Sequence, residues 1–400
     1  MRDIASSISP RLNEIFKKLK SDDHSAHLDI KVMTPFNLVL AVLTCAAGVV
    51  AVYRLIFGIG AASNLNDHWP WGLWISFDVL GGVAMAAGGF LIAGAVYILN
   101  WKKYKPIARP AILNAFFGYL LAAMSICLDI GRSFSIWHPL VMWQVNSIMF
   151  IVSVHVVLYT STLATESSPI LFEKLEMNRA LQIVNRFMVA IVLFGVLLSL
   201  LHQSSLGAVY LIVPGKLSPL WYSKYLPYMF LMSAIMMGLS MVSLETILSS
   251  SAFKHAPPRE VITGLARGVL IVAPLYLMAK IALLVTGPGL GAVLNGSFTA
   301  FLWLLEMGVG VVLPLVLLCM RSVRTNLHRI LVVDILVILG VLLNRLNVGI
   351  FGVSGYATRA GGDYFPSLME LTWTVGMVAF AILGFKLCAK YLHLFPETQH

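Results

Sequence analysis

The stretch WISFDVLGGVAMAAGGFLIAGAVYIL (residues 74–99) decides the fold class of this chain. Asp78 is its only charged residue. An α-helix rises 1.5 Å per residue, so about 20 residues cross the ~30 Å hydrocarbon core of a bilayer. No water inside that core can bond exposed backbone groups, so a crossing segment must satisfy its own as a helix. The stretch therefore predicts a transmembrane helix.

Nine further stretches of this kind fill most of the 400-residue chain. The ten predicted spans are 36–60, 74–99, 110–130, 139–163, 183–203, 226–250, 266–286, 297–320, 329–349 and 370–391. Charged residues make up only 12% of the chain, against about 25% in soluble proteins. We expect an all-α integral membrane protein, with a polar segment at 1–35, a transmembrane domain at 36–392 and a tail at 393–400.

The net charge of +10 is distributed as a topology signal. If the spans alternate in direction, 19 of the 28 lysines and arginines lie on the side of the N-terminus and five on the other; four lie in spans or at their ends. Short loops rich in lysine and arginine stay in the cytoplasm. We therefore expect both termini to be cytoplasmic, and the basic charge gives no reason to expect nucleic acid as a partner.

Metal and nucleotide chemistry have no support in the sequence. Cys45, Cys127, Cys319 and Cys388 are scattered singly and form no C-x-x-C pair, so no iron–sulfur or zinc site is expected. The glycine-rich stretch GGVAMAAGG (81–89) lies inside the second span, where small residues allow close helix packing. The predicted cytoplasmic loops are too short for a nucleotide-binding domain.

Aromatic residues gather in three predicted outer loops, at 61–73, 204–225 and 345–369. They are Trp69, Trp71, Trp221, Tyr222, Tyr225, Tyr356 and Tyr364. Such rings are typical of the aromatic belt at the headgroup level of a membrane. They would also suit a rim that docks a partner subunit, and the sequence leaves both interpretations open.

Polar residues within spans are the candidates for function. A charge at the bilayer centre costs at least ~2.5–3.5 kcal/mol. From span direction, the residues expected toward the outer side are Asp78, Asp129, His202 and Lys280. Glu306 is expected near the middle, and the residues expected toward the cytoplasm are Tyr97, His155, Glu245 and Asp334.

Each candidate also has a structural interpretation. Asp129 and Arg132 stand three apart and would share a helix face as a neutralising pair. His202 and Gln203 open the polar run HQSSLG (202–207), which is ordinary at the end of a span.

Two more candidates have a structural alternative. Lys280 and Glu306 could pair with each other across neighbouring helices, and Glu245 could extend toward the membrane surface. A haem held by two histidines is not expected, because His155 and His202 are predicted on opposite sides of the membrane.

Four segments together resemble the NrfD/polysulfide-reductase family of quinone-interacting membrane subunits. They are WPWGLWISFDVLGGVAMAAGGF (69–90), LDIGRSFSIWHPLVMW (128–143), LYTSTLATESSPILFEKL (158–175) and LSLLHQSSLGAVYLIV (198–213). The pattern is most similar to the branch with the HybB-type nickel–iron hydrogenase b subunit. One departure is Ile151, in a place where family members are expected to carry a glutamate; His155, one turn on, could substitute for it.

The resemblance implies two four-helix bundles flanked by the first and last spans, in a bacterial cytoplasmic (inner) membrane. It implies menaquinone or ubiquinone as substrate and no haem. It further implies a periplasmic partner, either an iron–sulfur (ferredoxin-like) or a multihaem cytochrome subunit, together with a catalytic subunit. The implied quinone pocket near the outer face is lined by Asp78, Asp129, Arg132, His202 and Gln203, with Trp71 and Trp74 at its entry.

The chemistry of the polar residues agrees with this function. Quinone reduction takes two electrons and two protons, and buried carboxylates or a histidine can relay protons. Arg132, His202 and Gln203 can donate hydrogen bonds to quinone carbonyls. A predicted proton pathway consists of Tyr97, His155, Glu245, Lys280, Glu306 and Asp334. The alternatives are a secondary transporter that uses the intramembrane carboxylates and a purely structural anchor.

Overall fold

A computed structural model describes residues 33–69, 71–254, 256–392 and 394–395. Within these residues the regular elements are helices, and ten of them are long and apolar enough to cross a membrane. The all-α class and the ten spans are thus confirmed. The predicted segments 1–35 and 393–400 lie almost entirely outside the described residues.

The first four-helix bundle contains α4 (Leu80–Ala93), α5 (Lys105–Asp129), α7 (Ile148–Lys174) and α8 (Asn178–Val209). Two π-helical segments extend α4, namely η1 (Trp74–Val79) before it and η2 (Gly94–Ile98) after it. Such π-bulges are frequent at functional sites, and here η1 carries Asp78 and η2 carries Tyr97.

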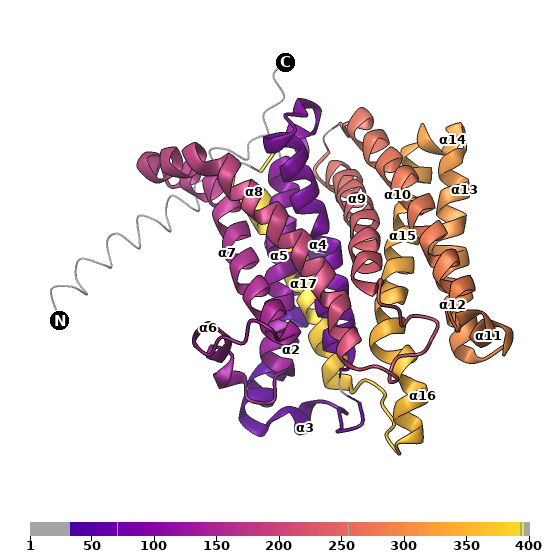
Figure 1. The fold of residues 1–400 in the computed structure, drawn as a ribbon. Coiled ribbons are helices and arrows are strands. Elements are labelled where there is room, and N and C mark those ends of the chain that lie inside the picture. Colours follow the sequence, from indigo (N-terminus) through magenta and orange to yellow (C-terminus); the bar gives the residue numbers. More distant parts are fainter. Residues whose placement is uncertain (1–32, 70, 255, 393, 396–400) are drawn as a thin grey trace, which may run out of the picture.

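The second bundle lies beside the first (Figure 1) and contains α9 (Leu226–Ala252), α10 (Arg259–Thr286), α12 (Phe298–Met307) and α15 (Leu327–Leu346). α12 continues through η6 (Gly308–Val312) into α13 (Leu313–Cys319). α15 continues through η7 (Asn347–Phe351) into α16 (Gly352–Arg359). Both continuations begin with a π-helical segment.

The first and last spans, α2 (Pro35–Phe57) and α17 (Leu368–Tyr391), pack against each other and beside α5 of the first bundle. Figure 1 shows α17 among the helices of that bundle. The short helices α3 (Ile59–Ala62), α6 (His138–Val141), α11 (Gly289–Leu294) and α16 all lie at one end of the molecule, drawn at the bottom of Figure 1. We call it the lower end; it is the end predicted to face outward.

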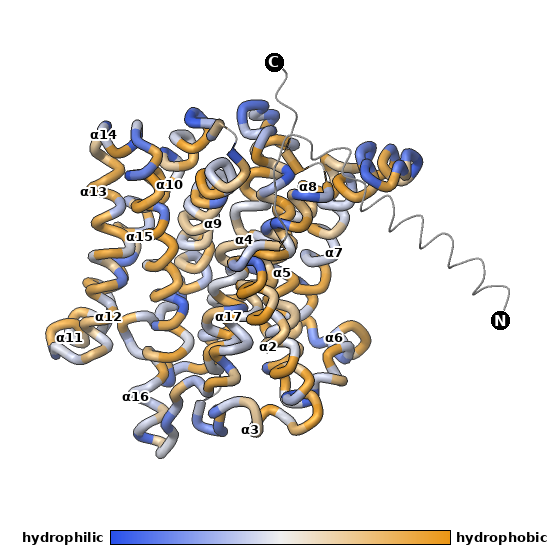
Figure 2. The backbone as a smooth tube through the Cα atoms, turned by 180° about the vertical axis from the view of Figure 1, so that it is seen from behind, coloured by the Kyte–Doolittle hydropathy of each residue, from blue (hydrophilic) through white to orange (hydrophobic). Residues whose placement is uncertain are grey.

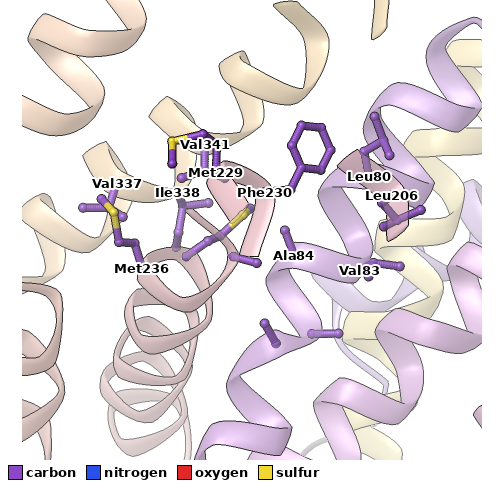
Figure 3. Close-up of a cluster of buried hydrophobic side chains, with 14 of the residues drawn as sticks. Leu80, Val83, Ala84, Leu206, Met229, Phe230, Met236, Val337, Ile338 and Val341 are labelled. Carbon is purple, nitrogen blue, oxygen red and sulfur yellow. The ribbon is translucent and has the colours of Figure 1, made fainter. Parts of the chain in front are cut away.

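Glycines bring the two bundles into contact. A Cβ atom added to Gly88 of α4 would meet the backbone of Gly238 in α9, and the converse holds for Gly238. On the lower side of this contact, apolar side chains of α4, α8, α9 and α15 fill the space between the bundles (Figure 3). Figure 2 shows hydrophobic residues along the long helices and hydrophilic ones gathered mainly at their ends and in the connections.

Several predicted span boundaries differ from the structure, and two of these errors move a histidine. The fourth span was expected at 139–163, but α7 begins at Ile148, where the Ser147 hydroxyl accepts from the backbone N–H of Phe150. His155 therefore lies near the lower end of its helix. The fifth span was expected to end at 203, but α8 runs to Val209, so HQSSLG lies inside a helix. Apolar character alone did not mark these helix ends.

Candidate functional site

The first bundle has a polar centre made of two histidine and two tyrosine rings. His202 (α8) stacks edge-on against His155 (α7), with ring centroids 5.9 Å apart. The ring centroid of Tyr119 (α5) lies 5.6 Å from that of His202, and the ring centroid of Tyr159 (α7) lies 4.4 Å from that of Tyr119. We call these four residues, with Ser199 of α8, the histidine cluster.

Several polar atoms of the histidine cluster are buried without a hydrogen-bond partner among the described residues, namely both ring nitrogens of His202 and Nδ1 of His155. The hydroxyls of Tyr119 and Tyr159 are also buried, and their bonding partner is the Ser199 hydroxyl. His202 is completely buried. A buried polar group without a partner costs about 1–3 kcal/mol, so this concentration calls for a functional explanation.

The histidine cluster overturns one argument from the sequence. His155 and His202 were predicted on opposite sides of the membrane, yet their rings are neighbours. The argument from depth against a haem between them is therefore wrong. The absence of haem stays a prediction, which rests on the family resemblance alone. His202 is likewise no interfacial residue at a span end.

Gln203 neighbours His202 in α8 and connects two helices of the first bundle. Its Nε2 donates to the carbonyl oxygen of Val83 in α4 at 2.8 Å, and its Oε1 is buried without a partner among the described residues. The amide nitrogen of Gln203 therefore links α8 to α4, and its amide oxygen is available to a ligand.

Asp78 is buried on a different side of the first bundle. Its Oδ2 accepts from Ser125 of α5 at 3.2 Å and from Thr374 of α17 at 3.0 Å. Trp373 of α17 donates in turn to the Ser125 hydroxyl at 2.9 Å. Asp78 thus joins η1 to α5 and α17, and its hydrogen bonds among the described residues do not reach His202.

The predicted pairing of Asp129 with Arg132 is wrong. α5 ends at Asp129 and the chain turns extended at Ile130, so Arg132 leaves the helix face and is exposed. Arg54 of α2 takes its place near Asp129. Arg54 donates to the carbonyl oxygens of Leu128 at 2.5 Å and Ile130 at 2.6 Å. A cation at a helix C-terminus satisfies the free carbonyls and the helix dipole.

Glu370, at the start of α17, completes this lower group and was not predicted. It caps its own helix through Ser367, and its backbone carbonyl accepts from the indole of Trp74 at 3.3 Å. Tyr364 donates to its carboxylate. Burial and the neighbouring Glu370 raise the pKa of the Tyr364 hydroxyl. Trp71 stands apart, half-buried against Tyr210 with ring centroids 5.1 Å apart.

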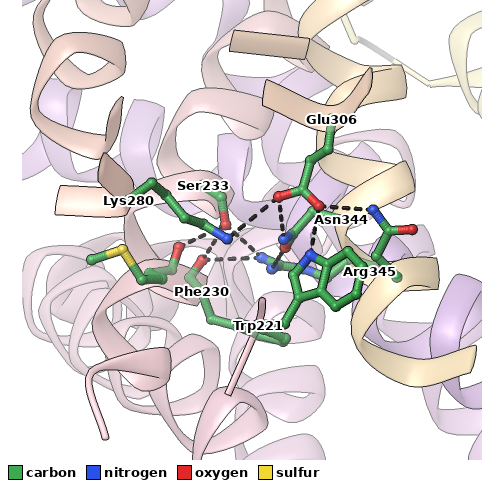
Figure 4. Close-up of polar contacts among 9 residues, drawn as sticks. Trp221, Phe230, Ser233, Lys280, Glu306, Asn344 and Arg345 are labelled. Atoms are coloured by element: carbon green, nitrogen blue, oxygen red, sulfur yellow. Dashed lines mark hydrogen bonds and ion pairs between the residues drawn. The ribbon is translucent and has the colours of Figure 1, made fainter. Parts of the chain in front are cut away.

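The second bundle has a charged centre, which we call the glutamate network (Figure 4). Glu306 of α12 receives four donors. Trp221 and Asn347 bond Oε2, both at 2.8 Å. Asn344 bonds Oε1 at 2.8 Å, and Lys280 of α10 lies 3.4 Å from the same oxygen. The two oxygens of a carboxylate offer about four acceptor sites, so this carboxylate is saturated.

The pairing of Lys280 with Glu306 was foreseen as a structural alternative and is confirmed. Arg345 was not foreseen, because it was assigned to an outer loop. It is fully buried, lies 3.8 Å from the ring centroid of Phe230, and donates to Asn344, Ser233 and the Phe230 carbonyl at 2.8–3.0 Å. Trp221, assigned to the aromatic belt, is also buried here.

The remaining predicted residues lie toward the upper end. Glu245 of α9 accepts from Asn114 of α5 at 2.9 Å, across the junction of the bundles. Asp334 of α15 is buried facing Ser240 and Ser243 of α9. Glu166 of α7, which was not predicted, is buried near Tyr97 and Tyr159.

Two further observations concern these upper residues: one shows how Glu166 is accommodated, and the other shows how far Asp334 lies from the glutamate network. A Cβ atom at Gly195 of α8 would collide with the Glu166 carboxylate, so the glycine makes room for it. Asp334 and Asn344 are ten residues apart on one helix, a rise of about 15 Å. Val337 and Val341, with Met236 of α9, occupy the apolar stretch between those levels (Figure 3). The predicted proton pathway thus falls into separate groups.

Comparison with known proteins agrees with the resemblance seen in the sequence. The family model described as "Polysulphide reductase, NrfD" matches residues 61–354. A protein of Nitratidesulfovibrio vulgaris is 35% identical over 93% of this chain and 97% of its own length. The probable Ni/Fe-hydrogenase 2 b-type cytochrome subunit of Escherichia coli is 31% identical over 87% and 89%. The menaquinone reductase integral membrane subunit of N. vulgaris is 27% identical over 88% and 89%.

Proposed function

Because the chain belongs to the NrfD family, we propose that it is the quinone-interacting membrane subunit of a respiratory oxidoreductase complex. It exchanges electrons between membrane menaquinone or ubiquinone and a periplasmic iron–sulfur or multihaem partner, which connects it to a catalytic subunit. One relative is named as the integral membrane subunit of a menaquinone reductase, and another as the probable b-type cytochrome subunit of a nickel–iron hydrogenase. Both names support a place in an oxidoreductase complex, and the first supports a link to quinone.

The histidine cluster is our proposed site for the quinone headgroup. The observation that carries this is His202, fully buried with both ring nitrogens unpartnered in the described structure. Such a ring can donate a hydrogen bond to a quinone carbonyl and accept one from a quinol hydroxyl. Gln203 and Tyr119 offer further bonding groups beside it. In this proposal Asp78 and Asp129 support the site from the α2–α17 side, and Arg132 takes no part in binding.

Conversion of quinone to quinol adds two electrons and two protons, and the reverse removes them. The electrons move to or from the partner docked at the lower end. The protons must pass through this chain's own side chains, and an imidazole ring can accept a proton at one nitrogen and donate one from the other. His202 and His155 are the proposed exchange pair, because their rings are in contact.

A proton route through the first bundle would continue from His155 through Tyr159 and Glu166 to Tyr97 in η2. Glu166 supports it, since it is a buried carboxylate near both tyrosines. Glu245 and Asp334 remain candidates for a separate upper-end path. Lys280 and Glu306 fit a relay less well, because four donors already occupy the Glu306 oxygens. No specific observation favours the transporter alternative.

The orientation of the chain is a further proposal, with both termini in the cytoplasm. The uneven distribution of lysine and arginine supports it. We expect a reporter enzyme fused after residue 215 to be active if it is of a type that functions only outside the cytoplasm. Activity of a cytoplasm-specific reporter at this position would reverse the orientation and place the docking face on the other side.

The decisive variant for the proposed site is His202→Gln, which keeps a polar side chain of similar length. Loss of a positioned proton donor typically slows turnover 10²–10⁴-fold. In membranes that hold the whole complex, we expect electron transfer to a menaquinone analogue to fall by about this factor. Electron transfer to a soluble dye should be unchanged, because it bypasses the quinone.

His328→Gln is the matched control, since this histidine is exposed at the upper end and should leave both activities intact. Full quinone-linked activity in His202→Gln would remove the quinone from the histidine cluster. A stoichiometric Soret band in the purified chain would also contradict the proposal, because it would assign His155 and His202 to a haem.

A further inference from the structure

A cavity of about 250 Å³ opens at the lower end of the second bundle. The connection 219–226 forms one wall, the last turns of α10 form another, and Trp303 of α12 closes it. Lys280 reaches the cavity from α10 while only 5% exposed, and Lys224 lies exposed in the connection. The cavity is therefore a built site with a buried cation.

The charge around this cavity is one-sided. None of the residues that line it is acidic. Glu306 lies behind Lys280 and Trp221, with its acceptor sites already used. The glutamate network holds two cations, Lys280 and Arg345, and one anion, Glu306, so it has one positive charge in excess. Lys224 adds a further positive charge at the cavity wall. An anion in the cavity would compensate this excess.

Lys280 also has bonding capacity left. An ammonium group carries three donors, and its contact with Glu306, at 3.4 Å, is longer than the 2.7–2.9 Å of a strong charge-assisted bond. Its Nζ also hydrogen-bonds to the side chain of Tyr276. One N–H group therefore remains to bond a ligand in the cavity.

The surroundings of the cavity suit a ligand with hydrocarbon chains. Ile271, Leu275, Met278 and Val285 of α10 are exposed and recur at helical spacing, so they form one apolar stripe along the helix. The stripe lies on the face of α10 opposite Lys280, and the cavity has apolar walls of its own in Leu226, Met229, Leu283 and Leu284. An anionic head in the cavity would thus lie against apolar walls, beside a helix whose outer face is apolar.

We propose that this cavity binds the phosphate head of a membrane phospholipid, with Lys280 as the buried ligand and Lys224 as the outer one. The bound lipid fixes the connection 219–226, which carries Trp221 onto Glu306. A quinone also has a head and an isoprenoid tail, but its head is uncharged and leaves the excess of positive charge uncompensated. The proposal stands independently of the quinone site.

The test uses the full chain, purified, stripped of lipid and titrated with phosphatidylglycerol, with bound lipid counted by native mass spectrometry. Lys280→Gln should weaken binding at least about 10-fold, because one charge-assisted bond is lost. Leu284→Trp fills the cavity and leaves the glutamate network untouched, so it should weaken binding as much even if Lys280→Gln does not fold. Lys216→Gln, at an outer-loop lysine that does not line the cavity, should bind like the wild type.

Three results would overturn the proposal. The first is unchanged phosphatidylglycerol binding in both cavity variants, Lys280→Gln and Leu284→Trp, or in the one that folds if the other does not. The second is displacement of the lipid by inorganic phosphate at similar concentration, which would make this a free-anion site. The third is displacement by menaquinone, which would make it a quinone site.

Discussion

The two bundles have polar centres in corresponding places, but the centres differ in charge and in how far hydrogen bonds satisfy their polar groups. In each, the central residues come from the second, third and fourth helices: Tyr119, His155 and His202 in the first, and Lys280, Glu306 and Asn344 in the second. Tyr119 and Tyr276 even stand at the same distance, ten residues, before the ends of α5 and α10. In the first centre the ring nitrogens of His202 have no partner among the described residues, whereas in the second the central carboxylate of Glu306 accepts four hydrogen bonds. At the edge of the second centre, Nε of Arg345 and Oδ1 of Asn347 are also without partners among the described residues.

This difference separates a site from a structural element. Buried charges are tolerated when hydrogen bonds satisfy them, and such a network rigidifies the surrounding helices. Unpartnered buried groups destabilise the fold unless something binds them. We therefore assign quinone chemistry to the first bundle and a structural role to the glutamate network of the second.

The largest effect should follow from Glu306→Leu. It leaves Lys280, Asn344, Asn347 and Trp221 without their acceptor, and breaking a buried pair costs about 3–5 kcal/mol. The thermal midpoint of the purified protein should fall sharply. Tyr119→Phe is the matched change in the first bundle and should lower the midpoint only slightly, since it removes one uncharged hydrogen bond, to Ser199. Equal effects of the two variants would erase the distinction between the bundles.

An effect of comparable size should follow from Arg54→Met, beside the first bundle. This change removes two hydrogen bonds to the C-terminus of α5, and hydrogen bonds to charged groups contribute about 1.5–3 kcal/mol each. Arg132→Met removes an exposed arginine close by and should stay within about 0.5 kcal/mol. Thermal unfolding of both variants checks this. If Arg132→Met lowered the thermal midpoint more than Arg54→Met, this result would support the predicted Asp129–Arg132 pair.

The sequence predicted the number and order of the spans because each span must be apolar on its own. It also predicted that Lys280 and Glu306 need partners, since a lone charge in a bilayer is costly. It missed the start of α7, because residues 139–147 are largely apolar although only 139–141 are helical, as the end of the short helix α6. It missed the upper end of α7, because Thr165–Lys174 is polar and still helical.

Contacts between distant segments were the other failure. Arg54 reaches Leu128, 74 residues away, and Trp74 reaches Glu370, 296 residues away. Spacing along one helix favoured Arg132 as the partner of Asp129, and only the end of α5 rules it out. Arg345 could have been suspected, since an arginine that directly follows an apolar run needs buried acceptors if the helix continues.

The most direct test of the account is to locate the quinone itself. A photoreactive azido-menaquinone can be cross-linked to the complex in membranes, and the labelled peptides identified by mass spectrometry. The account predicts labels on the first bundle, around Tyr119, His155–Tyr159 and Ser199–Gln203, with unlabelled menaquinone in excess suppressing them. Labels confined to the connection 219–226 and the end of α10 would contradict it and move quinone chemistry to the second bundle.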